Sequence, residues 1–201
     1  MTDTGIRRSR LSLAFRLFCC TSAASLLFGC GPSGDTSSTA NNANPSPNAS
    51  PTVALTNDYS IGNKISFAAA GNSKPFKVSG WSEAETQHCW TSGTASVIAM
   101  RISPAAQALT LKVKCGAFLK EPDISFQPVE VYLNDEKIAD WKVRDVAEYS
   151  APIPPAISKS GGLLTITLKI PKATSPKLLG TGEDSRLLGL ICFEASLIPT
   201  Q

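Results

Sequence analysis

Residues 109–115 read LTLKVKC, and this stretch decides the fold class. Leu109, Leu111, Val113 and Cys115 alternate with three polar side chains. In a β-strand, successive side chains point to opposite faces, so strict alternation predicts a strand with one buried face and one face in water. The stretch therefore predicts a half-buried strand, and the rest of the chain can be compared with it.

Similar short apolar runs recur on both sides of this stretch. They are predicted to be strands at residues 96–102, 129–133, 164–170 and 188–198. Residues 134–137 read NDEK between two such runs and predict a hairpin. The alternation in 188–198 is less regular, which predicts a bulge near Glu194. No window has a helical period, so the pattern predicts an all-β antiparallel β-sandwich.

The first 29 residues have the composition of an export signal. Four arginines precede a short apolar run at residues 17–28, which read LFCCTSAASLLF. That run is shorter than the roughly 20 residues that a helix needs to span a bilayer. A basic start, a short apolar stretch and small residues before a cut describe a secretory signal peptide. Residues 1–29 are therefore predicted to be removed from the mature protein.

Residues 27–30 read LFGC, with Leu27 three positions before Cys30 and the small Gly29 just before it. This stretch resembles the lipobox of bacterial lipoproteins. The resemblance implies a lipid on the thiol of Cys30 and acyl chains that hold the protein to a membrane, each contributing about 0.8 kcal/mol per buried CH₂. Gly31, in place of aspartate, implies the outer membrane of a bacterial cell envelope.

Residues 31–52 read GPSGDTSSTANNANPSPNASPT, with one charge and no large apolar side chain. Such a stretch cannot bury enough apolar surface to offset chain entropy, so a disordered linker is predicted. As a flexible coil it would reach about 25 Å. We therefore divide the chain into a signal peptide (1–29), a lipidated cysteine with its linker (30–52) and a β-sandwich domain (53–201).

The formal charge of +3 comes entirely from the predicted signal peptide. Four arginines and Asp3 lie in that segment, so the remaining basic and acidic side chains are equal in number. A neutral surface with interspersed charges gives no electrostatic basis for binding nucleic acid. The mature protein is therefore not expected to have a nucleic-acid partner.

Three cysteines belong to the predicted domain: Cys89, Cys115 and Cys192. An exported protein can form disulfides, and three cysteines allow at most one within the chain. Cys115 points inward by alternation and Cys192 shares a face with Leu190, which favours a Cys115–Cys192 disulfide. A bond that involves Cys89, or three packed thiols, are the alternatives. The spacings match no metal-ligand pattern, so neither a metal nor a cofactor is expected.

Two separated blocks of the domain carry a resemblance to a known family. They are GWSE at 80–83 with HCWTSG at 88–93, and SP at 175–176 with LG at 179–180, DSR at 184–186 and LGL at 188–190. Together they resemble an uncharacterised bacterial β-sandwich domain appended to membrane glycosyltransferases and phosphoglycerol transferases of the envelope. The resemblance covers most of residues 60–198. It implies a jelly-roll shape and a polysaccharide context, and it brings no catalytic residues.

The two blocks supply the candidate ligand-binding residues. They are Trp81, Glu83, His88, Trp90, Asp184 and Arg186. The tryptophans could form a platform for the apolar face of a sugar ring, and the polar side chains could bind its hydroxyls.

A structural role is the alternative for each of these residues. A tryptophan in a short strand is more often a core residue, and we favour that role for Trp90. Trp81 follows Gly80 near a predicted turn, and both roles are equally supported. Asp184 and Arg186 lie on the same side of an extended chain, so we favour an ion pair that pins the loop at 171–183.

The residue types offer little for catalysis. His88 is the only histidine and no Gly-x-Ser-x-Gly motif is present. Paired carboxylates drawn from Glu83, Glu85 and Asp184 would be unremarkable in any domain of this size. We therefore expect a non-enzymatic envelope lipoprotein whose module binds or handles surface polysaccharide. The alternative is a module that binds a protein partner in an envelope assembly.

Overall fold

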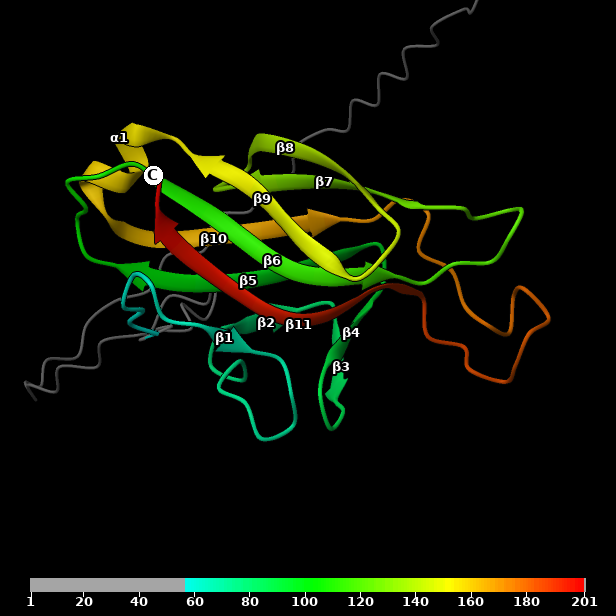
Figure 1. Ribbon diagram of the computed structural model, residues 1–201. Coiled ribbons are helices and arrows are strands. Elements are labelled where there is room, and N and C mark those ends of the chain that lie inside the picture. Colours follow the sequence, from blue (N-terminus) through cyan, green and yellow to red (C-terminus); the bar gives the residue numbers. More distant parts are fainter. Residues whose placement is uncertain (1–56, 201) are drawn as a thin grey trace, which may run out of the picture. The chain divides into compact units, whose positions relative to one another are not determined.

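The computed structural model describes residues 57–200, which form two packed antiparallel sheets (Figure 1). The predicted signal peptide at 1–29, the lipid on Cys30 and the linker to residue 52 lie outside the described residues. Within residues 57–200, no helix is long and apolar enough to cross a membrane.

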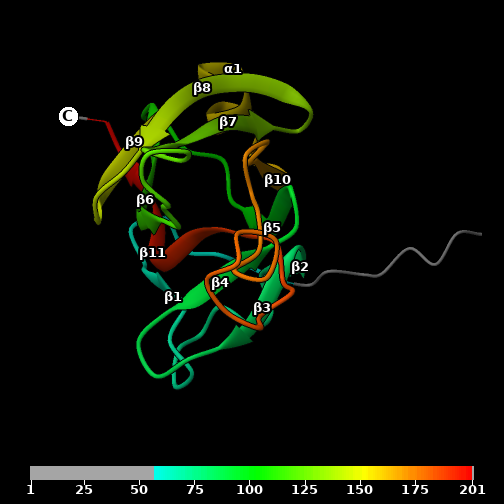
Figure 2. The same cartoon turned by 90° about the vertical axis from the view of Figure 1, so that its right-hand side faces the viewer.

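Each sheet has a path of five hydrogen-bonded strands. The β11 sheet has the order β3 (Trp81–Ala84), β4 (Cys89–Ser92), β11 (Leu188–Pro199), β6 (Leu109–Ala117) and β9 (Ala147–Ile153), with β1 (Ile65–Ser66) beside β11. The β10 sheet has the order β2 (Lys77–Ser79), β5 (Ala95–Ile102), β10 (Gly162–Lys169), β7 (Gln127–Leu133) and β8 (Glu136–Val143). Figure 2 shows β6 and β11 on one side of the domain and β5 and β10 on the other.

The pairing of the last eight strands is nested. The first pairs with the last, β4 with β11, and then β5 with β10, β6 with β9, and β7 with β8. A long hairpin wrapped into two sheets gives this pattern, which defines a jelly roll. The expected all-β fold and its jelly-roll arrangement are therefore both confirmed.

The alternation that predicted the central strands also describes the core. In β6, Leu109, Leu111, Val113 and Cys115 are all buried, with exposed fractions of 2% or less. The predicted hairpin joins β7 to β8, and the expected bulge near Glu194 interrupts the pairing of β11 with β6. The inward faces of the two sheets bury these side chains against each other, as in other β-sandwiches.

One short helix, α1 (Pro155–Ser160), corrects the expectation that the chain has no helical segment. Its proline opens the helix without losing a hydrogen bond, since the first amide of a helix has no partner within it. Gly161 ends it with a positive φ of 62°. The helix has only six residues, which is too few for a 3.6-residue period to appear in the sequence.

The three cysteines of the domain lie side by side on neighbouring strands. Cys192 of β11 is in register with Cys89 of β4 on one side and with Cys115 of β6 on the other. All three are fully buried and all three are free thiols. The sequence therefore placed Cys115 and Cys192 correctly on one inward face, but the disulfide that we favoured between them is not formed in this structure.

Candidate functional site

The outward face of the β11 sheet presents large aromatic side chains. In β4, Cys89 and Thr91 are buried in the core, so Trp90 between them points outward and is partly exposed. In β11, Phe193 follows the buried Cys192 and is also partly exposed. Because β4 and β11 are neighbours, their outward side chains meet on the surface of the sheet.

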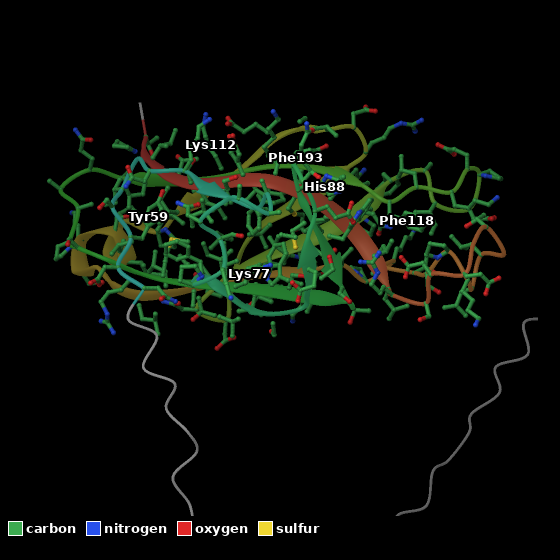
Figure 3. All side chains as sticks on the ribbon, turned by 90° about the horizontal axis from the view of Figure 1, so that it is seen from below. Tyr59, Lys77, His88, Lys112, Phe118 and Phe193 are labelled. Carbon is green, nitrogen blue, oxygen red and sulfur yellow. The ribbon has the colours of Figure 1, made fainter. Side chains whose placement is uncertain are left out.

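Four aromatic rings form a continuous row across this face, and we call Phe118, Trp90, His88 and Phe193 the aromatic row. The ring centroids of Phe118 and Trp90 are 6.2 Å apart, and those of Trp90 and His88 are 6.0 Å apart. His88 and Phe193 are 5.7 Å apart. Both contacts of Trp90 are edge-on, a favoured arrangement for aromatic pairs. Figure 3 labels three members of the row.

Gly116 lies in the middle of this face, and Val146 packs over it. Gly116 of β6 lies opposite Ile191 of β11, which in turn lies opposite Trp90. A Cβ added at Gly116 would come within 2.8 Å of a Val146 methyl group and 3.3 Å of an Ile191 methyl group. Val146 is itself 54% exposed. The aromatic row therefore continues into an apolar surface where a side chain on β6 would intrude.

Charged side chains border the row at its Phe193 end. The pairs are Lys64–Glu194 at 2.9 Å, Lys112–Glu148 at 2.5 Å and His88–Glu85 at 3.0 Å. A hydrogen bond to Glu194 and the charge of that carboxylate raise the pKa of Lys64. Lys114 has no ion pair among the described residues, and its ammonium lies 5.9 Å from the centre of the Phe193 ring. These groups offer both donors and acceptors beside the apolar rings.

Trp81 and Glu83 lie elsewhere, in a cleft where edge strands β2 and β3 approach each other. The Trp81 ring stacks on Phe67 with centroids 4.8 Å apart, and its Nε1 donates to the Val97 carbonyl at 2.9 Å. Gly80 makes this position possible, because a Cβ there would collide with the backbone of Ala95. Trp81 is therefore fixed in place and only partly exposed.

Asp184 and Arg186 form the ion pair that we favoured. The guanidinium makes a two-pronged contact, with Nε 3.0–3.1 Å from both carboxylate oxygens and Nη2 2.6 Å from Oδ2. These hydrogen bonds hold the pKa of Asp184 below its usual value. The Asp184 carbonyl also accepts from the Lys177 amide at 2.9 Å. This backbone hydrogen bond links two segments of the loop between β10 and β11, whereas the ion pair itself is local and joins residues two positions apart.

The six candidate residues do not form one site. His88 and Trp90 lie in the aromatic row, Trp81 and Glu83 in the edge cleft, and Asp184 and Arg186 in the loop. The core role that we favoured for Trp90 was wrong, because β4 buries the residues on either side of it. Buried and partly exposed side chains alternate in β4 because it pairs with β11, and a sequence of four residues could not reveal that pairing.

The sequence also missed half of the aromatic row. Phe118 directly follows β6, and Phe193 lies at the bulge of β11, where alternation gives no clear direction. A weak signal was present in β6, whose outward positions Lys112 and Lys114 lead to Gly116. A glycine at an outward position of a strand lets neighbouring side chains pack over the strand, and here Val146 does so.

The arrangement is suited to holding a ligand. Among the described residues, His88 hydrogen-bonds to no hydroxyl that could act as a nucleophile, and its only ion-pair partner is Glu85. No group of three or more His, Cys, Asp or Glu side chains in residues 57–200 is placed to hold a metal ion. What the surface offers is a line of rings with hydrogen-bonding groups at its border.

Comparison with known proteins finds low-scoring similarities in shape to several solved structures. No protein-family model matches the chain, and no curated protein is similar to it in sequence. Among solved structures, it is similar to a cycloisomaltooligosaccharide glucanotransferase of Paenibacillus sp., with 8% identity and a TM-score of 0.39 over 68% of this chain. The match spans 18% of that enzyme.

Two further similarities are to isolated carbohydrate-binding modules. A family 36 module in complex with calcium and xylotriose has 9% identity and a TM-score of 0.33, covering 60% of this chain and 85% of that one. A family 35 module from an environmental isolate has 16% identity and a TM-score of 0.31, covering 72% and 89%. At TM-scores below 0.5, these similarities assign no function to this chain.

Proposed function

We propose that this protein is a non-catalytic, glycan-binding module of a bacterial envelope lipoprotein, and that the aromatic row is its binding surface. The observation that carries the proposal is the row itself: Phe118, Trp90, His88 and Phe193 are partly exposed and lie 5.7–6.2 Å apart on one sheet face. An extended sugar chain laid along it would bury the apolar face of successive sugar rings on successive side chains.

The charged side chains that border the row suit a ligand that is polar on one side and apolar on the other. Lys114 has an ammonium free of ion pairs among the described residues, and the carboxylates of Glu148 and Glu194 keep further acceptor capacity beside their lysine partners. Binding sites for small polar ligands combine apolar surface with a few convergent polar groups in this way. Sugar hydroxyls are the ligand groups that match both donors and acceptors.

The anchor completes the proposal. The lipobox at 27–30 would hold the module at the membrane, and the linker at 31–52 would let it reach about 25 Å. A lipid-anchored module that binds glycan without cutting it would connect the membrane to surface polysaccharide. If Cys30 is the lipid site, Cys30→Ser should move the protein from the membrane fraction to the soluble fraction.

The test is a titration of the full-length protein in detergent with cellohexaose, xylohexaose and mannohexaose, followed by tryptophan fluorescence. We expect a saturable change with at least one sugar in a Trp81→Phe background, where Trp90 remains and Trp141 is buried in the core. Trp90→Ala, which also removes this fluorescent reporter, should abolish the binding when it is measured by titration calorimetry. If the folded protein binds none of the three at millimolar concentration, the proposal is wrong for neutral chains of these types.

A matched pair of phenylalanines controls for nonspecific effects. Phe193 and Phe126 are both partly exposed, and each ring lies under a lysine ammonium, that of Lys114 at 5.9 Å and that of Lys142 at 5.8 Å. Only Phe193 belongs to the row. We expect Phe193→Ala to weaken binding and Phe126→Ala to leave it unchanged. An equal loss in both variants would contradict the row as the site.

One observation favours a protein partner as the second candidate. Leu178, in the loop between β10 and β11, is 74% exposed and is the most exposed large apolar side chain among the described residues. If a partner docks there, Leu178→Ser should remove a crosslinked product formed in intact cells while sugar binding is retained. A product that survives Leu178→Ser but disappears in Trp90→Ala would place the partner on the aromatic row instead.

A further inference from the structure

The cleft at the edge of the sandwich is separate from the aromatic row. Its volume is about 540 Å³, within the range of about 300–1,000 Å³ typical of small-molecule sites. One wall comes from the segment after β1, with Ala68, Ser73 and Lys74, and the other from β2 and β3. These are the two edge strands of the two sheets, so the cleft lies where the sandwich is open.

Trp81 gives this cleft a rigid apolar wall. Phe67 covers one face of the indole, with the ring planes 21° apart, and the Val97 carbonyl engages Nε1. The indole is thus fixed from two directions, and the part of it that remains exposed lines the cleft. A ligand that stacks there loses little free energy to ordering the side chain, since it is already ordered.

Lys77 gives the cleft a cation with unused hydrogen-bonding capacity. Its side chain reaches from β2 toward the other sheet, where the ammonium lies 3.4 Å from the Ser82 carbonyl and 3.6 Å from the Cys89 sulfur. The contact to the carbonyl is long, sulfur is a weak acceptor, and an ammonium has three hydrogens to donate. Lys77 forms no ion pair among the described residues. Figure 3 labels Lys77 apart from His88, Phe118 and Phe193.

The remaining lining fits hydroxyl groups. Ser79 and Ser82 line the same wall, and Glu83 adds a carboxylate that accepts hydrogen bonds. Glu83 also places one negative charge beside the two lysines of the cleft, which disfavours ligands with two negative charges. Lys74, like Lys77, forms no ion pair among the described residues, so two ammonium groups and one carboxylate leave the cleft with one net positive charge. Together with the fixed indole and the hydroxyls, this charge specifies a ligand with an apolar face, hydroxyls and one negative charge.

We propose that the edge cleft is a second binding site, specific for a sugar unit that carries a carboxylate. The carboxylate binds Lys77, the apolar face of the ring contacts Trp81, and the hydroxyls bind the serines and Glu83. This site stands on its own residues and does not depend on the aromatic row. If both sites bind sugar, the domain selects glycans in which acidic units accompany neutral ones.

The experiment compares two ligands that differ only at one carbon, methyl β-D-glucuronide and methyl β-D-glucoside. The full-length protein carries Trp90→Phe, so that Trp81 is the emitter beside a ligand and Trp141 is buried. We expect a saturable fluorescence change with the glucuronide and an affinity for the glucoside about tenfold lower, because a charge-assisted hydrogen bond is lost. Equal affinities, or no change with either ligand, would overturn the proposal.

Two opposite charge changes distinguish binding from misfolding. Lys77→Gln should lower the glucuronide affinity about tenfold, while Lys169→Gln, a lysine near the Tyr132 ring and outside the cleft, should leave it unchanged. Glu83→Gln should raise the affinity by removing a like charge while keeping a hydrogen-bonding side chain. A gain of affinity cannot come from misfolding. If Glu83→Gln lowers the affinity, the assignment of the carboxylate to this cleft is wrong.

The proposals for the two binding sites can be disproved independently of each other. The aromatic row is tested with neutral hexasaccharides in the Trp81→Phe protein, and the edge cleft with the acidic monosaccharide in the Trp90→Phe protein. Loss of one signal with the other retained would identify which site is not a sugar site.

Discussion

The two faces of β4, β11 and β6 carry adjacent residues with opposite roles. The inner face has Cys89, Cys192 and Cys115 in register, and the outer face has Trp90, Ile191 and Gly116 in register. The three thiols are fully buried, whereas the tryptophan is partly exposed. One step along each strand thus separates the side chains that stabilise the fold from those that can meet a ligand.

This comparison shows why a residue type does not reveal its role here. A cysteine is often regarded as reactive and a tryptophan as structural, yet this sheet buries the first and displays the second. Hydrogen bonding to Cys115 and burial raise the pKa of the Cys192 thiol, which makes it a poor nucleophile in the folded protein. Substitutions of adjacent residues on one strand should therefore affect either stability or binding, according to the face on which each residue lies.

The largest expected effect is on stability, and it comes from replacing the adjacent residues Leu190 and Ile191 of β11. Leu190 is fully buried on the inner face, so Leu190→Ala should lower the free energy of unfolding by about 2–5 kcal/mol. Ile191 is partly exposed on the outer face, so Ile191→Ala should cost about 1 kcal/mol. Urea unfolding followed by tryptophan fluorescence measures both. Equal losses would contradict the division between the faces.

The next largest effect compares substitutions at the adjacent residues Trp90 and Thr91, of which one should change binding and the other stability. Trp90→Ala should abolish hexasaccharide binding and change stability little. The buried Thr91 hydroxyl accepts a hydrogen bond from the Leu190 amide at 2.8 Å. Thr91→Val leaves that amide unsatisfied and should cost about 1–3 kcal/mol of stability while leaving binding intact. A binding loss in a well-folded Thr91→Val protein would show that the faces are coupled.

The register of the three cysteines on the inner face predicts which of them can form a disulfide. Opposed residues on neighbouring antiparallel strands have Cα atoms about 4.5–5.5 Å apart, within the range of disulfides. Cys89 and Cys115 are two strand spacings apart, about 9.5 Å, which is too far to bond. In a protein with serine at positions 19, 20 and 30, oxidative refolding with glutathione disulfide should therefore give a species lighter by two hydrogens, in which Cys192 is always a partner.

Intact mass spectrometry with cysteine variants tests this prediction. Cys192→Ser should abolish the mass change, whereas Cys89→Ser should retain it through Cys115. A mass change that persists in Cys192→Ser would contradict the strand register. The folded protein, in which the thiols are buried, should react much more slowly than the refolding chain.

The smallest effect lies on neither face, in the loop pair of Asp184 and Arg186. Hydrogen bonds from Arg186 lower the pKa of Asp184 in the folded protein. The stabilisation is therefore present above the unfolded pKa of about 3.9 and is lost as the pH falls through the lower folded value. Asp184→Asn should reduce stability slightly at neutral pH and not at all once the carboxylate of the parent protein is protonated. Unfolding curves of both proteins across this pH range measure the difference.

Much of the fold followed from local pattern. The strands around residues 109–115 and 164–170 were predictable because alternating apolar and polar residues indicate a strand with one face buried and one face in water. The hairpin after Leu133 was predictable from its turn residues, Asn134 and Asp135, which both adopt positive φ. Helix α1 was missed because six residues show no period.

The candidate site was only partly predictable. His88 and Trp90 were recognised by residue type and by the block that contains them, but Phe118 and Phe193 come from distant parts of the chain. The aromatic row exists because β11 pairs with both β4 and β6. A contact between residues about 100 positions apart leaves no mark in a single sequence.

The sequence alone determined that residues 57–200 form an all-β domain, because alternation is a local property, and from its composition it predicted an export signal and a polar linker. It also determined which face of β6 is buried. The tertiary structure decided that three cysteines lie in one row, that Trp90 is on the surface and that Trp81 lines a cleft. Those features depend on which strands are neighbours, and long-range packing of the two sheets sets that order.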